Sequence, residues 1–156
     1  MGYIEDIRAK IGNMRILLPG CCVFIRNKKR QILMQLRTYP YGKWGLPGGL
    51  MELGESPEDT VRREVWEENG LRIGILSLFG VYSGADYLCI AQNGDEFQVV
   101  TLAYETDDFT GEPAVMDDES LSFEWFDINN LPQNIPRTHS KIISDYINRE
   151  SGKINE

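Results

Sequence analysis

The chain contains few of the residues that build disulfide frameworks or histidine-rich metal sites. Among its 156 residues are three cysteines, Cys21, Cys22 and Cys89, and one histidine, His139. Two cysteines are adjacent in an apolar run, their number is odd, and no Cys-x-x-Cys spacing occurs. These features predict buried free thiols in a reducing cytosol. A lone histidine near the start of a C-terminal helix is more typical of a polar or capping residue than of a catalyst.

Long apolar runs and an excess of positive charge are also missing. No apolar stretch approaches the roughly 18 residues that a membrane span needs, and the acidic N-terminal segment does not resemble a signal peptide. With 16 Lys and Arg against 24 Asp and Glu, the formal net charge is −8. Such a chain repels bulk nucleic acid and anionic membranes, although metal ions can reverse the local field for a small phosphorylated substrate. We therefore expect a cytoplasmic protein with neither nucleic acid nor membrane as partner.

Length and patterning predict one domain of mixed α/β class. A chain of this size suffices for one hydrophobic core, so residues 1–156 are expected to form a single domain. Strands and helices do not alternate regularly, which favours a mixed sheet packed between helices over a doubly wound parallel sheet. The expected elements are a helix at 3–11, a hairpin of strands 21–25 and 31–37, strands at 71–81, 87–91, 97–105 and 121–126, and a helix after Pro136.

The middle of the sequence combines a glycine- and proline-rich loop with a strongly marked helix. The density of Gly and Pro over 38–49 predicts a shaped loop without regular structure. Ser56 suits the N-cap and Pro57 the first helical position, and acidic residues follow in the first turn. An Asn-Gly pair at 69–70 provides the matching stop, so a helix over 57–69 is predicted.

Three carboxylates share one face of this helix. At about 100° per residue, Glu64 and Glu68 fall about 40° apart, and Glu67 lies about 60° to the other side of Glu64. Like charges at these spacings destabilise a helix by about 0.2–0.5 kcal/mol per pair. The ordinary alternative is a solvated acidic face balanced by neighbouring arginines. Gly48 and Gly49 weigh against it, because bare backbone beside carboxylates offers the hard oxygen ligands that Mg²⁺ or Mn²⁺ prefers.

The spacing of these residues matches a known family signature. The fixed positions run Gly49, five residues, Glu55, seven residues, Arg63-Glu64-Val65, one residue, Glu67-Glu68, one residue, Gly70-Leu71. This pattern resembles the Nudix box (residues 49–71) at every fixed position, and the segment 44–48 resembles its usual lead-in. A more diffuse resemblance extends over about residues 18–132.

The resemblance implies a fold, an activity and a metal site. The fold would be a Nudix-type α/β/α sandwich with a central mixed sheet. The activity would be hydrolysis of a nucleoside diphosphate linked to another moiety, with Mg²⁺ or Mn²⁺ as cofactor. By position, Glu64, Glu67, Glu68 and the carbonyl of Gly48 are expected to hold the metal.

Four further residues are predicted around that metal. Arg63 and Glu55 are expected to orient the carboxylates, Arg63 through a charge-assisted hydrogen bond to Glu67 four residues on. Relatives often place the general base in a loop ahead of the last strand, where Glu119 stands here; an ordinary solvated acidic loop is the alternative. Arg37 ends a strand before the Gly/Pro loop and is a candidate for binding a phosphate, with a surface role as its alternative.

The box leaves the small nucleotide substrate open, because it carries the metal and not the base. A nucleoside triphosphate, also in oxidised form, and a nucleotide sugar such as ADP-ribose both fit. A non-catalytic nucleotide-sensing domain on the same fold is the alternative, which a broken box would favour. An isoprenyl diphosphate isomerase is a third option, for which the cysteines offer no obvious match. Since relatives are often dimers, a homodimer is a further expectation, with residues 3–18 as a candidate contact.

Overall fold

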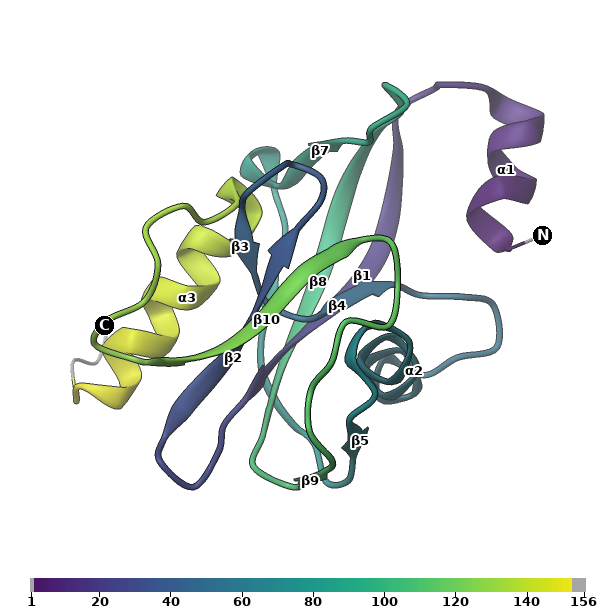
Figure 1. Cartoon of the computed structure of the whole chain (residues 1–156). Helices are drawn as coiled ribbons and strands as arrows, with labels where there is room; N and C mark the ends of the chain where they lie inside the picture. The colour runs from purple at the N-terminus through teal and green to yellow at the C-terminus, as the bar shows by residue number, and fades with distance from the viewer. Residues whose placement is uncertain (1, 153–156) are drawn as a thin grey trace.

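The structure, a computed structural model, describes residues 2–152 of the chain (Figure 1). Its helices within this range are α1 (Tyr3–Ile11), α2 (Pro57–Asn69), α3 (Arg137–Glu150) and the short 3-10 helix η1 (Ala85–Tyr87). Its strands are β1 (Ile16–Ile25), β2 (Gln31–Arg37), β3 (Trp44–Gly45), β4 (Gly48–Leu50), β5 (Arg72–Ile73), β6 (Ser77–Tyr82), β7 (Leu88–Ile90), β8 (Glu96–Thr106), β9 (Phe109–Thr110) and β10 (Ser120–Asp127). The three predicted α-helices are therefore confirmed.

The strands form a mixed arrangement between α2 and α3, which flank it on opposite sides in Figure 1. The larger sheet has the order β4-β1-β8-β6, with β7 also paired to β8. Within it β1 and β8 run parallel, while the other pairs are antiparallel. A second sheet has the order β10-β2-β3, and β5 pairs with β9. The predicted α/β class with mixed strand directions is confirmed, with the strands divided among these sheets.

Alternate residues of β1 contribute to two hydrophobic layers. Cys22 and Phe24 belong to the layer beneath α3, where Phe24 stacks on Tyr146 with ring centroids 4.0 Å apart. Cys21 and Val23 belong to the layer beneath α2, as the period of two in a strand requires. Both cysteines are free, and burial raises the pKa of each thiol to about 12. The prediction of buried free thiols is thus confirmed for this pair.

The predicted hairpin of strands 21–25 and 31–37 is wrong. The two strands lie in different sheets, and the pairing described between them is an isolated bridge between Arg26 and Ile32. β1 instead pairs with β4 and β8, and β2 pairs with β10 and β3. Only the turn between the two strands is determined by neighbouring residues. The strands with which each of them pairs are distant in the sequence.

Two other segments differ from their predicted form for the same reason. The stretch 71–81 is two strands, because β5 pairs with β9 whereas β6 pairs with β8. The Gly/Pro-rich stretch 38–49 contains β3 and the start of β4, which pair with β2 and β1. Strands predicted at 87–91, 97–105 and 121–126 are found as β7, β8 and β10.

Helix α1 stands at one end of the molecule, beside the loop that follows β4 (Figure 1). None of its residues is buried. Its first turn is attached to that loop, since the Tyr3 amide donates to the Glu52 carboxylate at 3.0 Å. At its other end the Arg8 guanidinium donates to the backbone carbonyls of Met14 and Glu96. The homodimer through residues 3–18 stays a prediction. Among residues 2–152, no helix is both long enough and apolar enough to cross a bilayer.

Candidate active site

Local sequence fixes the direction in which α2 presents its carboxylates. The Ser56 hydroxyl accepts a hydrogen bond from the Asp59 amide at 3.1 Å, and the Asp59 carboxylate accepts from the Ser56 amide at 3.2 Å. This capping box satisfies two amide groups at the start of the helix. Val61 and Val65 are fully buried against β1. Burial of this apolar stripe fixes the rotation of the helix, which turns its glutamates toward β4.

Two of the three carboxylates predicted as metal ligands lie beside the glycines of β4. The Gly48 amide donates to Glu68 Oε1 at 3.1 Å. A side chain added at Gly49 would overlap the Glu64 carboxylate. The glycines therefore allow the two carboxylates to lie close to the bare backbone of β4. Glu67 lies farther out, with 54% of its side chain exposed.

Glu68 is the most unusual group of the site. The residue is 1% exposed, and its Oε2 is buried without a hydrogen-bond partner. Burial, reinforced by the charge of Glu64, raises the pKa of Glu68 well above its ordinary value. Burial also raises the pKa of Glu64 to about 7, against the opposing effect of Arg63. Burying a carboxylate lowers the free energy of unfolding. Buried carboxylates with raised pKa values are therefore typical of functional sites.

Arg63 joins the carboxylates into one network. Its Nε and Nη2 donate to the two oxygens of Glu55 at 2.7 and 3.0 Å, a bidentate pair. Its Nη1 donates to Glu64 at 2.9 Å and to Glu67 at 3.2 Å. Nη2 also donates to the carbonyl of Leu50 at 3.1 Å. The hydrogen bonds from Arg63 lower the pKa of Glu55. The structure thus brings Arg63 and Glu55 beside the predicted ligands, and the predicted contact from Arg63 to Glu67 is present.

Arg37 lies close enough to Glu68 for their charges to interact. Its Nη2 donates to the Leu46 carbonyl at 3.3 Å, and its Nε is buried without a partner. A side chain at Gly45 would lie 2.7 Å from Nε, so the guanidinium packs on bare backbone. Burial lowers the pKa of Arg37, and the negative charge of Glu68 opposes this effect. Arg37 is thus half-buried with an enclosed Nε, and both the phosphate contact and its alternative, a surface role, stay predictions.

The acidic loop before β10 is fastened to α2. The Met116 amide donates to the Glu68 carbonyl, and the Ala114 amide to the Asn69 carbonyl, both at 3.0 Å. Glu119 is exposed, and its carbonyl accepts from the Thr38 amide at 3.1 Å. Its charge contributes to raising the pKa of Glu64. The loop thus holds Glu119 within electrostatic range of the box, and its role as a base stays a prediction.

The residues present fit a divalent metal, although they are not gathered into a closed cage. Within residues 2–152 no three or more His, Cys, Asp or Glu side chains converge closely enough to enclose an ion. Two features nevertheless suit a hard cation: the unpaired Oε2 of Glu68 and the space that Gly49 leaves at Glu64. Carboxylate oxygens with a backbone carbonyl are suitable ligands for Mg²⁺ or Mn²⁺. The ligand set Gly48, Glu64, Glu67 and Glu68 stays a prediction.

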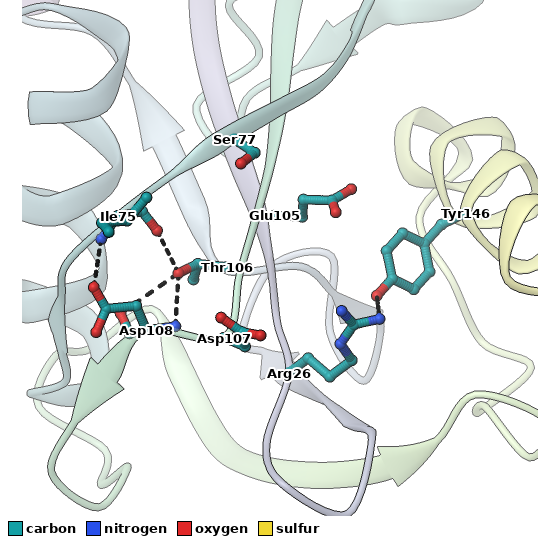
Figure 2. Close-up of a pocket in the computed structure, with 8 residues that line it drawn as sticks. All are labelled: Arg26, Ile75, Ser77, Glu105, Thr106, Asp107, Asp108 and Tyr146. Atoms are coloured by element: carbon teal, nitrogen blue, oxygen red, sulfur yellow. Dashed lines mark hydrogen bonds between the residues drawn. The ribbon is translucent and has the colours of Figure 1, made fainter.

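Two cavities lie outside the box. One of about 240 Å³, shown in Figure 2, is lined by Arg26, Ile75, Ser77, Glu105, Thr106, Asp107, Asp108 and Tyr146. In it the Thr106 hydroxyl donates to the Ile75 carbonyl at 2.6 Å, and Asp108 accepts from the Ile75 amide at 2.7 Å. These bonds secure the chain between β5 and β6. Another cavity of about 370 Å³ lies between α3 and the segment 131–135. Size alone therefore does not identify the site.

Comparison with known proteins agrees with this geometry. The NUDIX domain family model matches residues 17–146. An ADP-ribose pyrophosphatase of Methanocaldococcus jannaschii is 36% identical over 129 residues, 82% of this chain and 72% of that protein. An oxidized purine nucleoside triphosphate hydrolase of Danio rerio is 33% identical over 99 residues, 64% of this chain and 58% of that protein. A MutT NUDIX hydrolase from Burkholderia pseudomallei has a TM-score of 0.68 and 31% identity, covering 81% of this chain and 95% of that one.

The chain belongs to the Nudix hydrolase family. Both the resemblance of the box and the predicted class of enzyme are thereby confirmed. The sequence analysis expected His139 to be a polar or capping residue, and did not predict its contact with the lead-in to the box. His139 lies on α3, is 8% exposed, and accepts a hydrogen bond from the Leu46 amide in the lead-in to the box. The two residues are 93 positions apart, and no local pattern in the sequence predicts this contact.

Proposed function

We propose that the protein is a metal-dependent diphosphohydrolase that cleaves the P–O–P link of a nucleoside diphosphate derivative. The observation that carries the proposal is the buried Glu68 carboxylate, unpaired at Oε2 and hydrogen-bonded to Gly48 inside an intact box. The substrate classes are a nucleoside triphosphate and a nucleotide sugar such as ADP-ribose. The names of two relatives, an ADP-ribose pyrophosphatase and an oxidized purine nucleoside triphosphate hydrolase, represent one class each.

In this proposal Glu64, Glu67, Glu68 and the Gly48 carbonyl hold Mg²⁺ or Mn²⁺. A bound divalent cation supplies charge neutralisation at the diphosphate and Lewis acidity toward an attacking water. Water adds to one phosphorus, the bridging P–O bond breaks, and the proton released from the water passes to Glu119 as general base.

Two arginines have different tasks around these ligands. Arg63, fixed by its bidentate pair with Glu55, orients Glu64 and Glu67 through the contacts already described. Arg37 offers a positive charge near Glu68, which favours the binding of a phosphate beside the box. Loss of a supporting partner of this kind typically lowers metal affinity or activity about 10- to 100-fold. We expect an effect of the same order in this site.

The proposal is tested by a substrate screen of the purified protein. Nucleoside triphosphates, oxidised nucleotides, dinucleoside polyphosphates and nucleotide sugars are each incubated with Mg²⁺ and with Mn²⁺. Released phosphate is measured after a coupled phosphatase or pyrophosphatase. Metal-dependent turnover of one class supports the proposal and identifies the substrate. A folded protein that binds a nucleotide but turns over none of them contradicts it in favour of a sensing domain.

Added metal is expected to stabilise the protein more strongly at pH 8 than at pH 5. The pKa of Glu64 is raised from 4.5 to about 7 in the folded chain. Between these values the metal-free folded state binds more protons than the unfolded state, so its unfolding free energy falls as pH rises. Metal needs the deprotonated carboxylate, so the gain in Tm on adding Mn²⁺ should grow across the same window. Thermal scans with Mn²⁺ and with EDTA measure it; a gain independent of pH would contradict the assignment.

Glu119→Gln is expected to lower kcat while leaving KM nearly unchanged. A general base accepts a proton in the transition state and does not contribute to substrate binding. Such groups typically increase the reaction rate about 10²- to 10⁴-fold. Steady-state kinetics on the substrate found in the screen measures both constants. Asp118→Asn, in the same exposed loop, is the matched control and should retain full activity. Unchanged kcat in Glu119→Gln would remove Glu119 from the mechanism.

A further inference from the structure

The peptide groups of Leu46 are held from two sides of the molecule. The Leu46 amide donates to His139 Nδ1 on α3 at 3.0 Å. The Leu46 carbonyl accepts from Arg37 Nη2 on β2 at 3.3 Å. The Leu46 side chain is fully buried in the hydrophobic layer beneath α3. Both hydrogen-bonding groups of this residue are therefore fixed by side chains that are distant in sequence.

The next two residues carry this constraint into the metal site. The Pro47 carbonyl accepts from the Val23 amide of β1 at 3.0 Å. The Gly48 amide donates to Glu68 Oε1 at 3.1 Å. A hydrogen bond from a different element thus holds each residue of the segment 46–48. Proline restricts the backbone of this short run further, so the orientation at Leu46 is passed on to Gly48.

We propose that His139 is a positioning residue of the active site. By accepting the Leu46 amide, it fixes the segment 46–48 and thereby the orientation of Gly48 beside Glu68. The inference rests on the proposed function, because it takes Gly48 and Glu68 as metal ligands. It assigns to α3, which contributes no residue to the box, an influence on metal affinity that acts through the segment 46–48.

The chemistry of a buried imidazole suits this task. An Nδ1 atom that accepts a hydrogen bond carries no proton, so the ring is neutral and protonated at Nε2. Burial and the nearby charge of Arg37 lower the pKa of His139 well below its ordinary value, which favours this form. The neighbours of His139 along the apolar face of α3, Ile142 and Ile143, are themselves buried in the core. The packed core beneath α3 therefore holds the acceptor atom, Nδ1, in place.

Three substitutions separate positioning from packing. In His139→Asn the Oδ1 atom stands in the place of Nδ1 and can accept the Leu46 amide. His139→Gln keeps a polar amide but moves its acceptor one bond farther out, and His139→Leu has no acceptor. We expect Mn²⁺, titrated calorimetrically without nucleotide, to bind the Gln and Leu variants on the order of 10-fold more weakly. The Asn variant should stay within about 3-fold of the wild type, the effect of a well-replaced hydrogen bond.

Kinetics and stability complete the comparison. In the Gln and Leu variants kcat at limiting Mn²⁺ should fall with metal affinity and recover at saturating Mn²⁺, while KM for the nucleotide stays unchanged. Ser140→Ala, whose hydroxyl donates to the Pro136 carbonyl within α3, is the control and should bind Mn²⁺ like the wild type. If all three His139 variants lose Tm to similar extents yet bind Mn²⁺ normally, His139 is a packing residue and the inference is wrong.

A measurement on the unmodified protein covers the case in which the variants do not fold. Coupling between two sites is reciprocal, so metal binding must tighten the Leu46–His139 hydrogen bond. Hydrogen exchange of the Leu46 amide, followed by NMR, should slow several-fold on adding Mg²⁺, relative to the Ala91 amide, which is bonded to Asp95 in a distant turn. Unchanged exchange at saturating Mg²⁺ overturns the inference. Failure of the wild type to bind Mg²⁺ or Mn²⁺ overturns the proposed function instead.

Discussion

Glu68→Gln is expected to lower metal-dependent turnover at least about 100-fold, the upper end of what loss of a mere supporting partner costs. Glutamine keeps an oxygen to accept the Gly48 amide, so the hydrogen bond that places the side chain survives. It lacks the negative charge that a metal ligand at this position needs. Turnover of the substrate found in the screen, measured at saturating Mg²⁺ or Mn²⁺, tests the expectation.

The fold should tolerate this substitution. Because burial raises the pKa of Glu68, its charged form opposes folding at neutral pH. Removing the charge should leave the metal-free Tm within about 2–4 °C of the wild type, the shift that about 1 kcal/mol produces in a domain of this size. Glu58→Gln on the same helix is the control and should keep full activity, since its amide oxygen can still accept the Tyr104 hydroxyl. Normal turnover in Glu68→Gln would contradict the assigned site.

Gly48→Ala is expected to destabilise the protein more than any other glycine substitution in the box loop. The φ angle of Gly48 is 153°, and an added Cβ would overlap the Cys21 carbonyl and lie 2.8 Å from Cys22 Cα. Both contacts are backbone atoms of a central strand and cannot move aside. Strain and overpacking each cost about 1–3 kcal/mol, and each kcal/mol lowers Tm by about 2–4 °C. Thermal unfolding without metal measures the loss.

Gly54→Ala is the matched control for this effect. Gly54 also has a positive φ, of 86°, but an added Cβ would meet nothing within 4 Å. Its cost should therefore be confined to backbone strain, about 1–3 kcal/mol. If the two alanine variants lose the same stability, close packing against β1 is not what requires glycine at position 48.

Elements fixed by neighbouring residues were predictable from sequence. Helix α2 begins and ends at the residues that its Ser-Pro start and Asn-Gly stop indicated. The network of Arg63 followed from an i,i+4 spacing and the family pattern. The positions of Glu64 and Glu68 relative to β4 also agree, because adjacent glycines and a buried stripe on the helix dictate them.

Elements whose position depends on partners distant in the sequence could not be predicted in this way. Nothing in strands 21–25 and 31–37 shows that one pairs with β8 and the other with β10. The burial of Arg37 depends on the backbone at Gly45, and the role of His139 depends on a contact across the sheets. Each of these contacts depends on how the sheets stack on each other. The sequence around these residues contains no local pattern that predicts this stacking.

The central position of Arg63 has a consequence for how the protein comes to be active. Three acidic side chains that would repel one another, Glu55, Glu64 and Glu67, all pair with the permanent positive charge of Arg63. Some small metal-binding domains, such as zinc fingers, stay unfolded until the ion arrives. Here Arg63 already compensates part of the negative charge of these carboxylates. Under the proposed function, loading with Mg²⁺ or Mn²⁺ is then a step that can follow folding, and the free concentration of the ion sets the active fraction of the folded protein.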